Sequence, residues 1–409
     1  MSKLKIAILS YRSAPFGGGQ GIYIHDISKA LAIMGHEVEV ISGPPYPNLS
    51  ENVSLTKLPG LDLFQTFSFK KRLNIFLNKK NKKFIDFYEF ISTLFGGFPE
   101  MKTFGERANN YLKVNSGFDV VIDNQSLSYG LIAIEKRFPL IEIIHHPITK
   151  DYQYELKSSD KFLYRLSRHR WYSFLKMQKR VAPKLNKIIT PSYNSKKDIV
   201  NDFKVADKNI SVINNGLDTT IFRLIEKDIF KNNYQLITTA SADVPLKGLD
   251  YTLYALSSLK KTYPEILLNI IGKLKKNGHT ERLIEKLDIK NNIRFHSGIS
   301  KEEIVQLYSK SSIAIVSSLY EGFGIPPLEA MAVGCPVICS NTSSLPEVVG
   351  AAAEMFDPLD EEAMKVAMES VLDSESRRND LVAAGRDRHL MFTWEKCARE
   401  TEAIYRNLV

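Results

Sequence analysis

Glu321 and Glu329 are separated by seven residues in the stretch EGFGIPPLEAMAVG. Two carboxylates can accept hydrogen bonds from sugar hydroxyls, or they can form the acid and base pair of a glycosidase. A glycosidase pair needs carboxyl groups that face each other across the scissile bond, which this spacing does not require. In a third interpretation both glutamates are exposed to solvent and Glu329 only favours a helix start.

The elements around the two glutamates favour the first interpretation. The apolar run at 312–318 predicts a buried strand, so Glu321 falls at its carboxyl end, where open α/β sheets bind ligands. The double proline suits the first turn of a helix, and Gly334 is expected to end that helix. Glu329 is then expected in the first turn, beside free N–H groups that suit a phosphate.

Strand and helix patterns alternate twice along the chain, which predicts two doubly wound α/β domains. A Gly-containing turn at Asn215-Gly216 is the expected junction. The first series of expected strands covers 4–10, 37–42, 119–123, 140–145 and 187–192. The second covers 210–218, 234–241, 266–272, 292–298, 312–318 and 335–340.

Composition excludes several classes of protein. The 409 residues are 44% hydrophobic, which indicates a folded chain long enough for two domains. The three cysteines form no CxxC pair, so neither a disulfide framework nor a zinc site is expected. So few cysteines are typical of a reducing compartment, and a cytoplasmic location is expected. No apolar run reaches the length of a signal peptide or a membrane span.

The net charge of +9 is unevenly distributed. Residues 1–220 hold 32 Lys+Arg and 20 Asp+Glu, a balance of +12, so the remainder carries −3. This asymmetry indicates that the first domain faces something anionic. A nucleic-acid ligand would call for basic and aromatic residues on a recognisable binding module, which the sequence lacks, so no nucleic-acid partner is expected.

Several segments together resemble retaining glycosyltransferases of family 4. EGFGIPPLEAMAVGCPVICS resembles their E-x7-E signature, and further matches are GHEVEVIS, INNGLDTTIF, KGLDYTLYAL, SLPEVVG and FTWEKCARETEAIY. The resemblance covers nearly the whole chain and is weakest in 50–115. It implies an α/β protein of the GT-B fold, with two Rossmann-like parallel-sheet domains facing a central cleft. Residues 1–216 would be the acceptor-side domain, 217–388 the nucleotide-sugar domain, and 389–409 a helix returning to the first.

The resemblance also assigns roles to residues. Glu321 would contact hydroxyls of the donor sugar, Glu329 would bind the ribose, and Lys247 would bind the diphosphate and stabilise its charge on departure. His145 matches the family's histidine near the donor sugar better than His146 does. Backbone N–H groups of three further residues would contact the sugar and diphosphate: Phe323, Gly324 and Ile325.

Other positions carry weaker matches. Gly18 and Gly19 match paired glycines whose backbone approaches the donor, although PFGGGQG alone is only a flexible turn. The family places an arginine five or six residues before the lysine, where this chain has Ser241 and Ala242, and what replaces it stays open. Base selection is expected to rest on backbone contacts around 297–299, with Ile299 among the donor-binding residues.

The activity that this resemblance implies is sugar transfer from a UDP- or GDP-sugar to an acceptor hydroxyl, with retention at the anomeric carbon. The acceptor would be a glycan, a lipid-linked glycan or a small metabolite, in cell-envelope glycan or polysaccharide synthesis. No cofactor or metal is expected, because no Asp-x-Asp motif stands at a strand end and the His pair lacks clustered partners. The alternatives are an epimerase or phosphorylase on the same fold, or a relative that binds donor without turnover.

The segment 61–98 suggests where an anionic partner would bind. Basic clusters alternate with aromatic residues there, which is typical of a peripheral segment on the inner face of a membrane. The alternative is that the aromatic residues form core and the lysines a solvated face. The basic residues are Lys70, Lys71, Arg72, Lys79, Lys80, Lys82 and Lys83; the aromatic ones are Phe64, Phe67, Phe69, Phe76, Phe84, Phe87, Tyr88 and Phe90.

Overall fold

The computed structural model describes residues 2–14, 19–224 and 234–408. The chain divides into two compact units. The first unit comprises Met1–Pro191, Ser195–Asn214 and Trp394–Val409, and the second comprises Ser192–Asn194 and Asn215–Thr393. The boundaries therefore lie near Asn214 and Thr393, a few residues from the positions expected at 216 and 388.

In the described residues of the first unit, parallel strands form a seven-stranded sheet in the order β3-β2-β1-β4-β5-β6-β7. The edge strand β3 was not predicted, because only Val53 of its five residues is buried and no apolar run marks it. The strands are β1 Lys5–Ser10, β2 Glu37–Ser42, β3 Val53–Lys57, β4 Val120–Asn124, β5 Leu140–Ile143, β6 Ile188–Thr190 and β7 Ile210–Val212.

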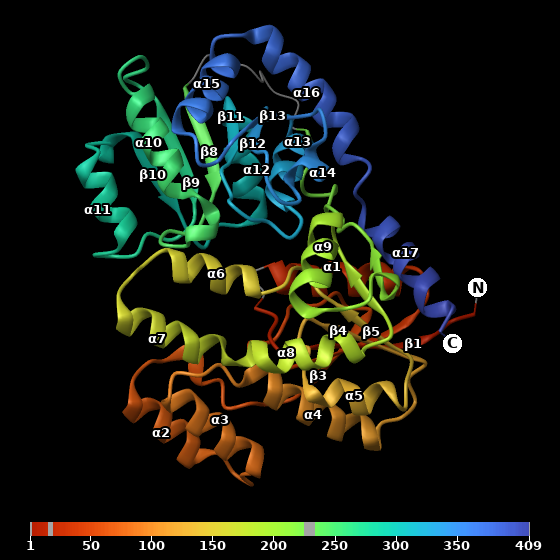
Figure 1. Cartoon of the computed structure of the whole chain (residues 1–409). Helices are drawn as coiled ribbons and strands as arrows, with labels where there is room; N and C mark the ends of the chain where they lie inside the picture. Colours follow the sequence, from red (N-terminus) through yellow and green to blue (C-terminus); the bar gives the residue numbers. More distant parts are fainter. Residues whose placement is uncertain (1, 15–18, 225–233, 409) are drawn as a thin grey trace. The chain divides into compact units, whose positions relative to one another are not determined.

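Helices cover both faces of this sheet (Figure 1). Because side chains alternate along a strand, Ile6 and Ile8 of β1 pack with α1 and α17, whereas Ala7 and Leu9 pack with α4, α5 and α8. The helices of this unit are α1 Gly19–Ile33, α2 Phe69–Asn78, α3 Phe84–Leu94, α4 Glu100–Val114, α5 Tyr129–Glu135, α6 Thr149–Lys157, α7 Phe162–Trp171, α8 Leu175–Val181 and α17 Trp394–Arg406; α9 Tyr193–Phe203 begins with two residues of the second unit.

The second unit holds a parallel sheet of six strands in the order β10-β9-β8-β11-β12-β13. Its strands are β8 Gln235–Thr239, β9 Leu267–Ile271, β10 Ile293–His296, β11 Ile313–Val316, β12 Val337–Ser340 and β13 Glu354–Phe356, the last not predicted from the sequence. The helices are α10 Leu249–Leu259, α11 His279–Lys286, α12 Lys301–Lys310, α13 Ile325–Val333, α14 Leu345–Val349, α15 Glu361–Leu372 and α16 Glu375–His389.

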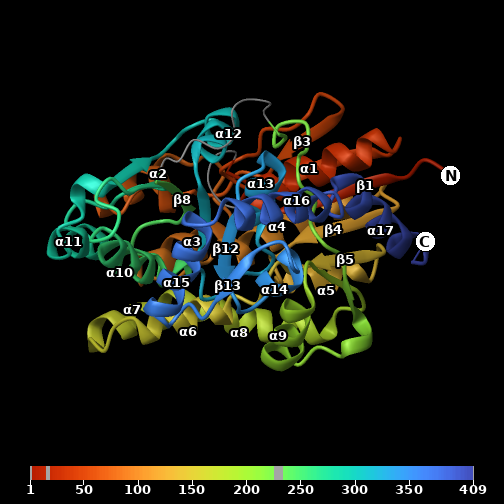
Figure 2. The same ribbon diagram turned by 90° about the horizontal axis from the view of Figure 1, so that it is seen from above.

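The two ends of the chain meet on the first unit, as Figure 2 shows. The Arg406 guanidinium donates a 2.8 Å hydrogen bond to the carbonyl of Ser2. Helix α17 lies along α1, with Trp394 in edge-to-face contact with Tyr23. In the described parts of the chain, no helix is long and apolar enough to cross a membrane.

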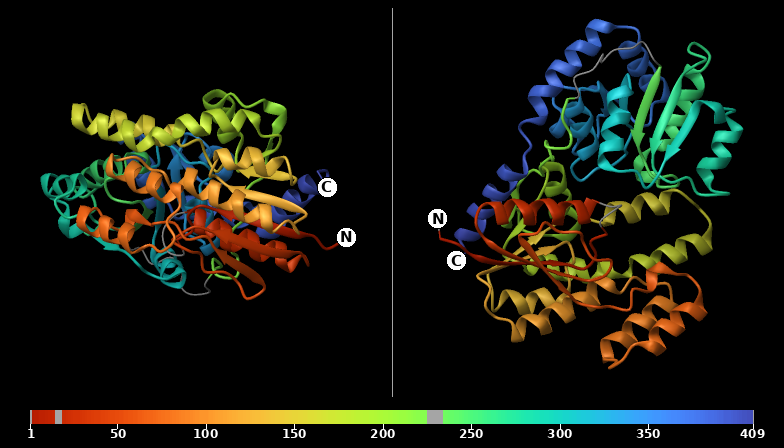
Figure 3. Two further views of the ribbon diagram at one scale, coloured as in Figure 1. Left: turned by 90° about the horizontal axis from the view of Figure 1, so that it is seen from below. Right: turned by 180° about the vertical axis from the view of Figure 1, so that it is seen from behind.

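Helices α2 and α3 form a pair at one margin of the first unit, drawn in orange in Figure 3. Phe76 and Phe90 stack at 4.4 Å between ring centroids and form a small core with Leu61 and Leu63. Phe64 packs against Phe98 and Trp171. The alternative that all the aromatic residues of segment 61–98 belong to a core is wrong. Five of them are exposed: Phe67, Phe69, Phe84, Phe87 and Tyr88.

Candidate active site

The middle of the second unit's sheet is a topological switch point. Strands β8 and β11 are neighbours there, and the strand order runs outward from them in opposite directions (Figure 1). The loops after these two strands therefore diverge, which is where open α/β sheets bind ligands. Lys247 follows β8 in the short 3-10 helix Pro245–Lys247, and Glu321 follows β11.

Lys247 and Glu321 form an ion pair across this switch point. The Lys247 Nζ lies 2.6 Å from Glu321 Oε1, and the Ser318 hydroxyl donates to the same oxygen at 2.7 Å. Gly248 fixes the approach of the lysine, because its φ is +61° and a Cβ there would lie 2.0 Å from the carbonyl oxygen of Ser317. A cation is thereby held at the sheet edge, beside a carboxylate that can accept further hydrogen bonds.

Serine side chains hold the loop that carries Glu321. The Glu321 N–H donates to the Ser343 hydroxyl at 2.9 Å, and the Ser344 hydroxyl donates to the carbonyls of Glu321 and Phe323 at 2.9 and 2.7 Å. The Ser192 hydroxyl donates to the carbonyl of Gly322 at 2.7 Å. These serines were not predicted as site residues, although the polar run NTSS directly after β12 places Ser343 and Ser344 at the same edge.

Helix α13 begins as expected but places Glu329 differently. Gly324 is its N-cap with φ 106°, the two prolines follow in the first turn, and Gly334 ends it with φ 83°. Glu329 is the fifth helical residue, so the prediction that it lies in the first turn is wrong. Because the prolines lack an N–H, only Gly324 and Ile325 can offer free backbone donors at this helix start. Phe323 is buried against Phe392.

Glu329 lies in a partly apolar environment within the second unit. Burial raises the pKa of its carboxyl to about 7, against the opposing effects of Lys301 and of the Tyr308 hydroxyl. That hydroxyl donates to Glu329 Oε2 at 3.4 Å. A half-buried carboxyl group with this one hydroxyl donor can accept further hydrogen bonds from a diol such as a ribose.

Ser241 and Ile299 follow β8 and β10, so both lie at the same edge of the sheet as Lys247. Gly272, after β9, lies beside Ser241, since a Cβ on Gly272 would be 3.5 Å from the Cα of Ser241. Lys273, which comes next, is exposed.

His145 belongs to the first unit and follows β5. Its Nε2 lies 2.8 Å from Asn124 Oδ1, and its ring meets that of Tyr23 edge to face at 4.7 Å. Burial lowers the pKa of His145 to about 3, so its imidazole is neutral near pH 7. His146 pairs with Asp151 instead.

The paired glycines at the start of α1 are only partly described. Gly19 is the first residue of α1 and is exposed, whereas Gly18 lies outside the described residues. Among the described residues, no group of three or more His, Cys, Asp and Glu side chains could hold a metal ion.

Comparisons with known proteins cover nearly the whole chain. Residues 17–221 match the family Glycosyltransferase Family 4, and residues 221–388 match Glycosyl transferases group 1. The chain is 40% identical to the MMP alpha-(1->4)-mannosyltransferase of Mycolicibacterium hassiacum, over 99% of this chain and 98% of that one. It is 38% identical to the O-antigen chain mannosyltransferase B of Escherichia coli, over 31% of this chain and 33% of that one.

Similarity to solved structures extends to the whole fold. The sucrose-phosphate synthase of Thermosynechococcus elongatus superimposes with a TM-score of 0.76 at 19% identity, over 99% of both chains. Two Rossmann-like domains and this likeness identify the fold as GT-B. The chain belongs to the glycosyltransferases that join a Family 4 N-terminal domain to a group 1 C-terminal domain.

Proposed function

We propose that this glycosyltransferase transfers a mannosyl residue from a nucleotide sugar to a hydroxyl of an acceptor glycan, with retention at the anomeric carbon. The choice of mannose rests on the mannosyltransferase that is 40% identical over nearly the whole chain. The observation that carries the chemistry is the Lys247–Glu321 ion pair at the switch point of the second unit's sheet.

In the proposed reaction the bond between the anomeric carbon and the diphosphate oxygen breaks, and a bond from the acceptor oxygen forms on the same face. The acceptor proton passes to the departing phosphate oxygen, and a nucleoside diphosphate leaves. Lys247 stabilises the negative charge that develops on the diphosphate. Glu321 is already paired with Lys247 and Ser318, so it is suited to bind and orient sugar hydroxyls.

Residues in the same unit would hold the nucleotide part of the donor. Glu329 would accept hydrogen bonds from the ribose hydroxyls, and the N–H groups of Gly324 and Ile325 would contact the diphosphate. Lys273 follows Gly272, which lies beside Ser241, and it would supply the second positive charge that Ser241 and Ala242 cannot.

A panel of nucleotide sugars tests this proposal. We expect hydrolysis of GDP-mannose or UDP-mannose by the full chain at rates above those of the UDP-glucose and ADP-glucose controls, with release of the nucleoside diphosphate. Proton NMR at early times should show the α anomer of the sugar product if the configuration is retained. Interconversion of the donor sugar without release of nucleoside diphosphate would instead indicate an epimerase and contradict the proposal.

We also propose that the enzyme binds peripherally to an anionic membrane surface through α3. Apolar residues cover one exposed stripe of this helix and its C-cap: Phe84, Phe87, Tyr88, Ile91, Leu94 and Phe95. The opposite stripe, which faces the protein, carries the buried acids Asp86 and Glu89. An amphipathic helix with its apolar side outward and lysines before it supports an interfacial role.

A further inference from the structure

A hydrogen-bond network in the first unit surrounds His145, the residue that matches the family's histidine near the donor sugar. His145 lies two residues after β5, and β5 is the neighbour of β4 in the sheet (Figure 1). Asn124, the last residue of β4, is fully buried and is the register partner of Ile143. The end of β4 is therefore placed to act on the histidine.

The backbone around His145 is fixed by an amide side chain. Gln125 Oε1 accepts from the His145 N–H at 2.8 Å, and Gln125 Nε2 donates to the carbonyl of His146 at 3.1 Å. The Ser195 hydroxyl donates to the carbonyl of His145 at 3.3 Å. These contacts set the position from which the imidazole ring projects.

The loop that carries Gln125 adopts a conformation that is uncommon for residues other than glycine. The angle φ is +61° at Gln125 and +46° at Leu127. Asp123 holds this loop, because its carboxylate accepts from the N–H and the hydroxyl of Ser126 at 2.8 and 3.0 Å. Strained backbone persists where the surrounding contacts demand it, and such residues cluster at functional sites.

The imidazole ring of His145 is held on two sides. Its Nε2 lies 2.8 Å from Asn124 Oδ1, and its ring meets that of Tyr23 edge to face at 4.7 Å. Tyr23 is buried and in turn contacts the ring of Trp394 at 5.5 Å. The imidazole cannot turn over and exchange its two nitrogens without losing the hydrogen bond to Asn124.

Two serines set the direction of the Asn124 amide. The Ser13 hydroxyl donates to Ser10 Oγ at 2.6 Å, and the Ser10 hydroxyl donates to the carbonyl of Arg12 at 3.3 Å. Because the Ser10 proton is already used, its oxygen accepts from Asn124 Nδ2, at 3.4 Å. The amide oxygen of Asn124 therefore faces His145. Since that oxygen can only accept, the proton of the neutral imidazole lies on Nε2.

The other ring nitrogen of His145 keeps a lone pair. Burial lowers the pKa of His145 to about 3, so the ring carries a single proton near pH 7. Within the described part of the chain, no group forms a hydrogen bond with Nδ1. An imidazole with its only proton on Nε2 accepts a hydrogen bond at Nδ1 and cannot donate there.

We propose that Asn124 is a positioning residue that holds His145 in the Nε2–H tautomer, so that Nδ1 accepts a hydrogen bond from a sugar hydroxyl. The identity of that ligand rests on the proposed function. The opposite tautomer would turn the lone pair of Nε2 toward the oxygen of Asn124 and would present an N–H group to the ligand. Asn124 acts through His145 and needs no contact with the sugar.

The tautomer of His145 can be measured directly in the full chain. The sequence has eight histidines, so labelling with ¹⁵N-histidine gives few signals, and His145→Gln identifies the signals of His145. Proton–nitrogen correlation through the ring C–H groups distinguishes a protonated nitrogen from an unprotonated one. We expect a single tautomer at pH 7, with the proton on Nε2. The Nδ1–H tautomer, or the mixture that free histidine shows, would contradict the inference before any variant is made.

Asn124→Leu tests the cause, because it removes the acceptor at similar volume. We expect both tautomers in this variant and, in a working enzyme, a kcat at least tenfold lower with a nucleotide Kd within twofold of the wild type. Asn124→Asp should restore the single tautomer, because a carboxylate oxygen also accepts from Nε2–H. The matched control is Gln178→Leu, which removes another buried amide of this unit that contacts Met101 instead. It should leave both the tautomer and kcat unchanged.

The outcomes separate this inference from the proposed function. If Asn124→Leu folds like the wild type by circular dichroism and keeps the Nε2–H tautomer, Asn124 does not set the tautomer and the inference is wrong. A changed tautomer with an unchanged kcat would also contradict it. If the tautomer depends on Asn124 but the wild type releases no nucleoside diphosphate from a mannose nucleotide, the positioning role stands and the transferase proposal fails.

A smaller change decides the matter if Asn124→Leu does not fold. Ser10→Ala leaves Asn124 in place but removes the oxygen that fixes the direction of its amide. The amide can then turn over and offer its NH₂ group to the ring, so we expect both tautomers of His145. An unchanged single tautomer in this variant would contradict the inference.

Discussion

At the scale of single residues, the proposed function gives Lys247 the main electrostatic role when the donor bond breaks. In the structure its ammonium is paired with Glu321, so part of its charge is already neutralised. The diphosphate gains negative charge as it leaves, and the lysine interacts more strongly then. We therefore expect Lys247→Ala to lower kcat roughly 100-fold and to weaken nucleotide-sugar binding much less.

Steady-state kinetics and calorimetry on Lys247→Ala separate the two roles. Lys260→Ala is a suitable control, because this lysine pairs with Asp288 at the surface of the same unit. A variant that binds donor tenfold more weakly with an unchanged kcat would make Lys247 a binding residue only.

Glu329 gives the second unit a pH-dependent stability. The folded-state pKa of about 7 exceeds the ordinary value of 4.5, so between these pH values the folded chain holds a proton that the unfolded chain has lost. The free energy of unfolding therefore falls as pH rises through this window, by up to about 1.4 kcal/mol per pH unit. Glu329→Gln removes this effect. The free energy of unfolding of the variant, measured relative to that of the wild type, should therefore rise between pH 5 and pH 8.

Urea denaturation at both pH values measures this change, with the exposed Glu285→Gln as control. A stability difference between Glu329→Gln and wild type that stays constant from pH 5 to pH 8 would contradict the raised pKa. The same variant should also bind nucleotide sugar more weakly by about 1–3 kcal/mol if Glu329 contacts the ribose.

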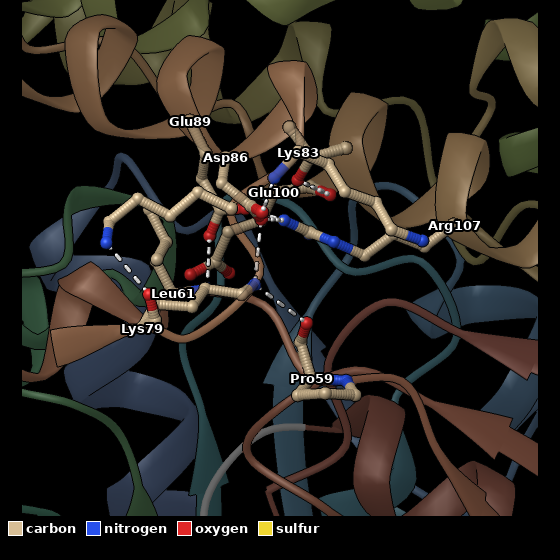
Figure 4. Close-up of polar contacts among 10 residues, drawn as sticks. Pro59, Leu61, Lys79, Lys83, Asp86, Glu89, Glu100 and Arg107 are labelled. Carbon is tan, nitrogen blue, oxygen red and sulfur yellow. Dashed lines mark hydrogen bonds and ion pairs between the residues drawn. The ribbon is translucent and has the colours of Figure 1, made fainter. Parts of the chain in front are cut away.

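At the scale of elements, α3 is built with its polar side inward. Asp86 caps the helix by accepting from the Lys83 N–H at 2.8 Å and also binds Lys79 and Arg107, so acids occupy the buried stripe. The exposed stripe begins with Phe84, which is 86% exposed. Those ion pairs (Figure 4) and the small core that contains Leu61, Leu63, Phe76 and Phe90 hold the helix against the rest of the unit.

We expect the full chain to co-sediment with vesicles that contain anionic phosphatidylglycerol and to dissociate as salt rises. Each lysine near such a surface contributes about 1 kcal/mol, and the exposed rings insert at the acyl boundary. Lys79 and Lys82 make contacts within the protein, so the charge-reversal variant should change the exposed lysines instead: Lys70, Lys71 and Lys80 to Glu.

A second variant tests the apolar stripe. Phe84→Ser, Ile91→Ser and Phe95→Ser together should abolish vesicle binding, because all three are more than half exposed. The matched control replaces apolar residues of similar exposure in the second unit: Leu359, Val366 and Leu390. Equal vesicle binding by both triple variants would contradict the membrane proposal. A wild-type dimer in light scattering that only the α3 variant loses would also contradict it and would favour a second copy of the chain as the partner.

The sequence predicted elements better than it predicted contacts. Strands with continuous apolar runs were found, but β7, which was expected to open the second series, belongs to the first sheet beside β6. Strands β3 and β13 were missed because they are short edge strands with few buried residues. Gly334 and the prolines correctly marked the ends of α13, but not that Glu329 lies past its first turn. The Lys247–Glu321 pair joins residues 74 apart and depends on β8 and β11 being neighbours.

At the scale of the whole molecule, the chain returns to the first unit for its last helix. Trp394, Cys397, Ala398 and Tyr405 of α17 are buried in the core that β1 and α1 build. The Tyr405 hydroxyl lies 3.0 Å from His36 Nε2, and the Leu4 N–H donates to the other ring nitrogen at 3.3 Å. The first unit thus depends on residues that the chain supplies only after the second unit is complete.

Removing residues 394–409 should therefore destabilise the first unit and spare the second. Burial of a large apolar side chain contributes about 1.5–3 kcal/mol, so the loss of this helix approaches the whole stability of a typical domain. Trp394→Ala is the milder test, with an expected loss of about 3–5 kcal/mol, since Trp394 packs against Tyr23.

Hydrogen exchange followed by mass spectrometry should show faster exchange in β1 and α1 and unchanged exchange in β8 and β11. The control is Arg399→Ala, because that side chain is exposed on the same helix. Unaltered protection of β1 in the truncated chain would show that α17 is dispensable for the first unit.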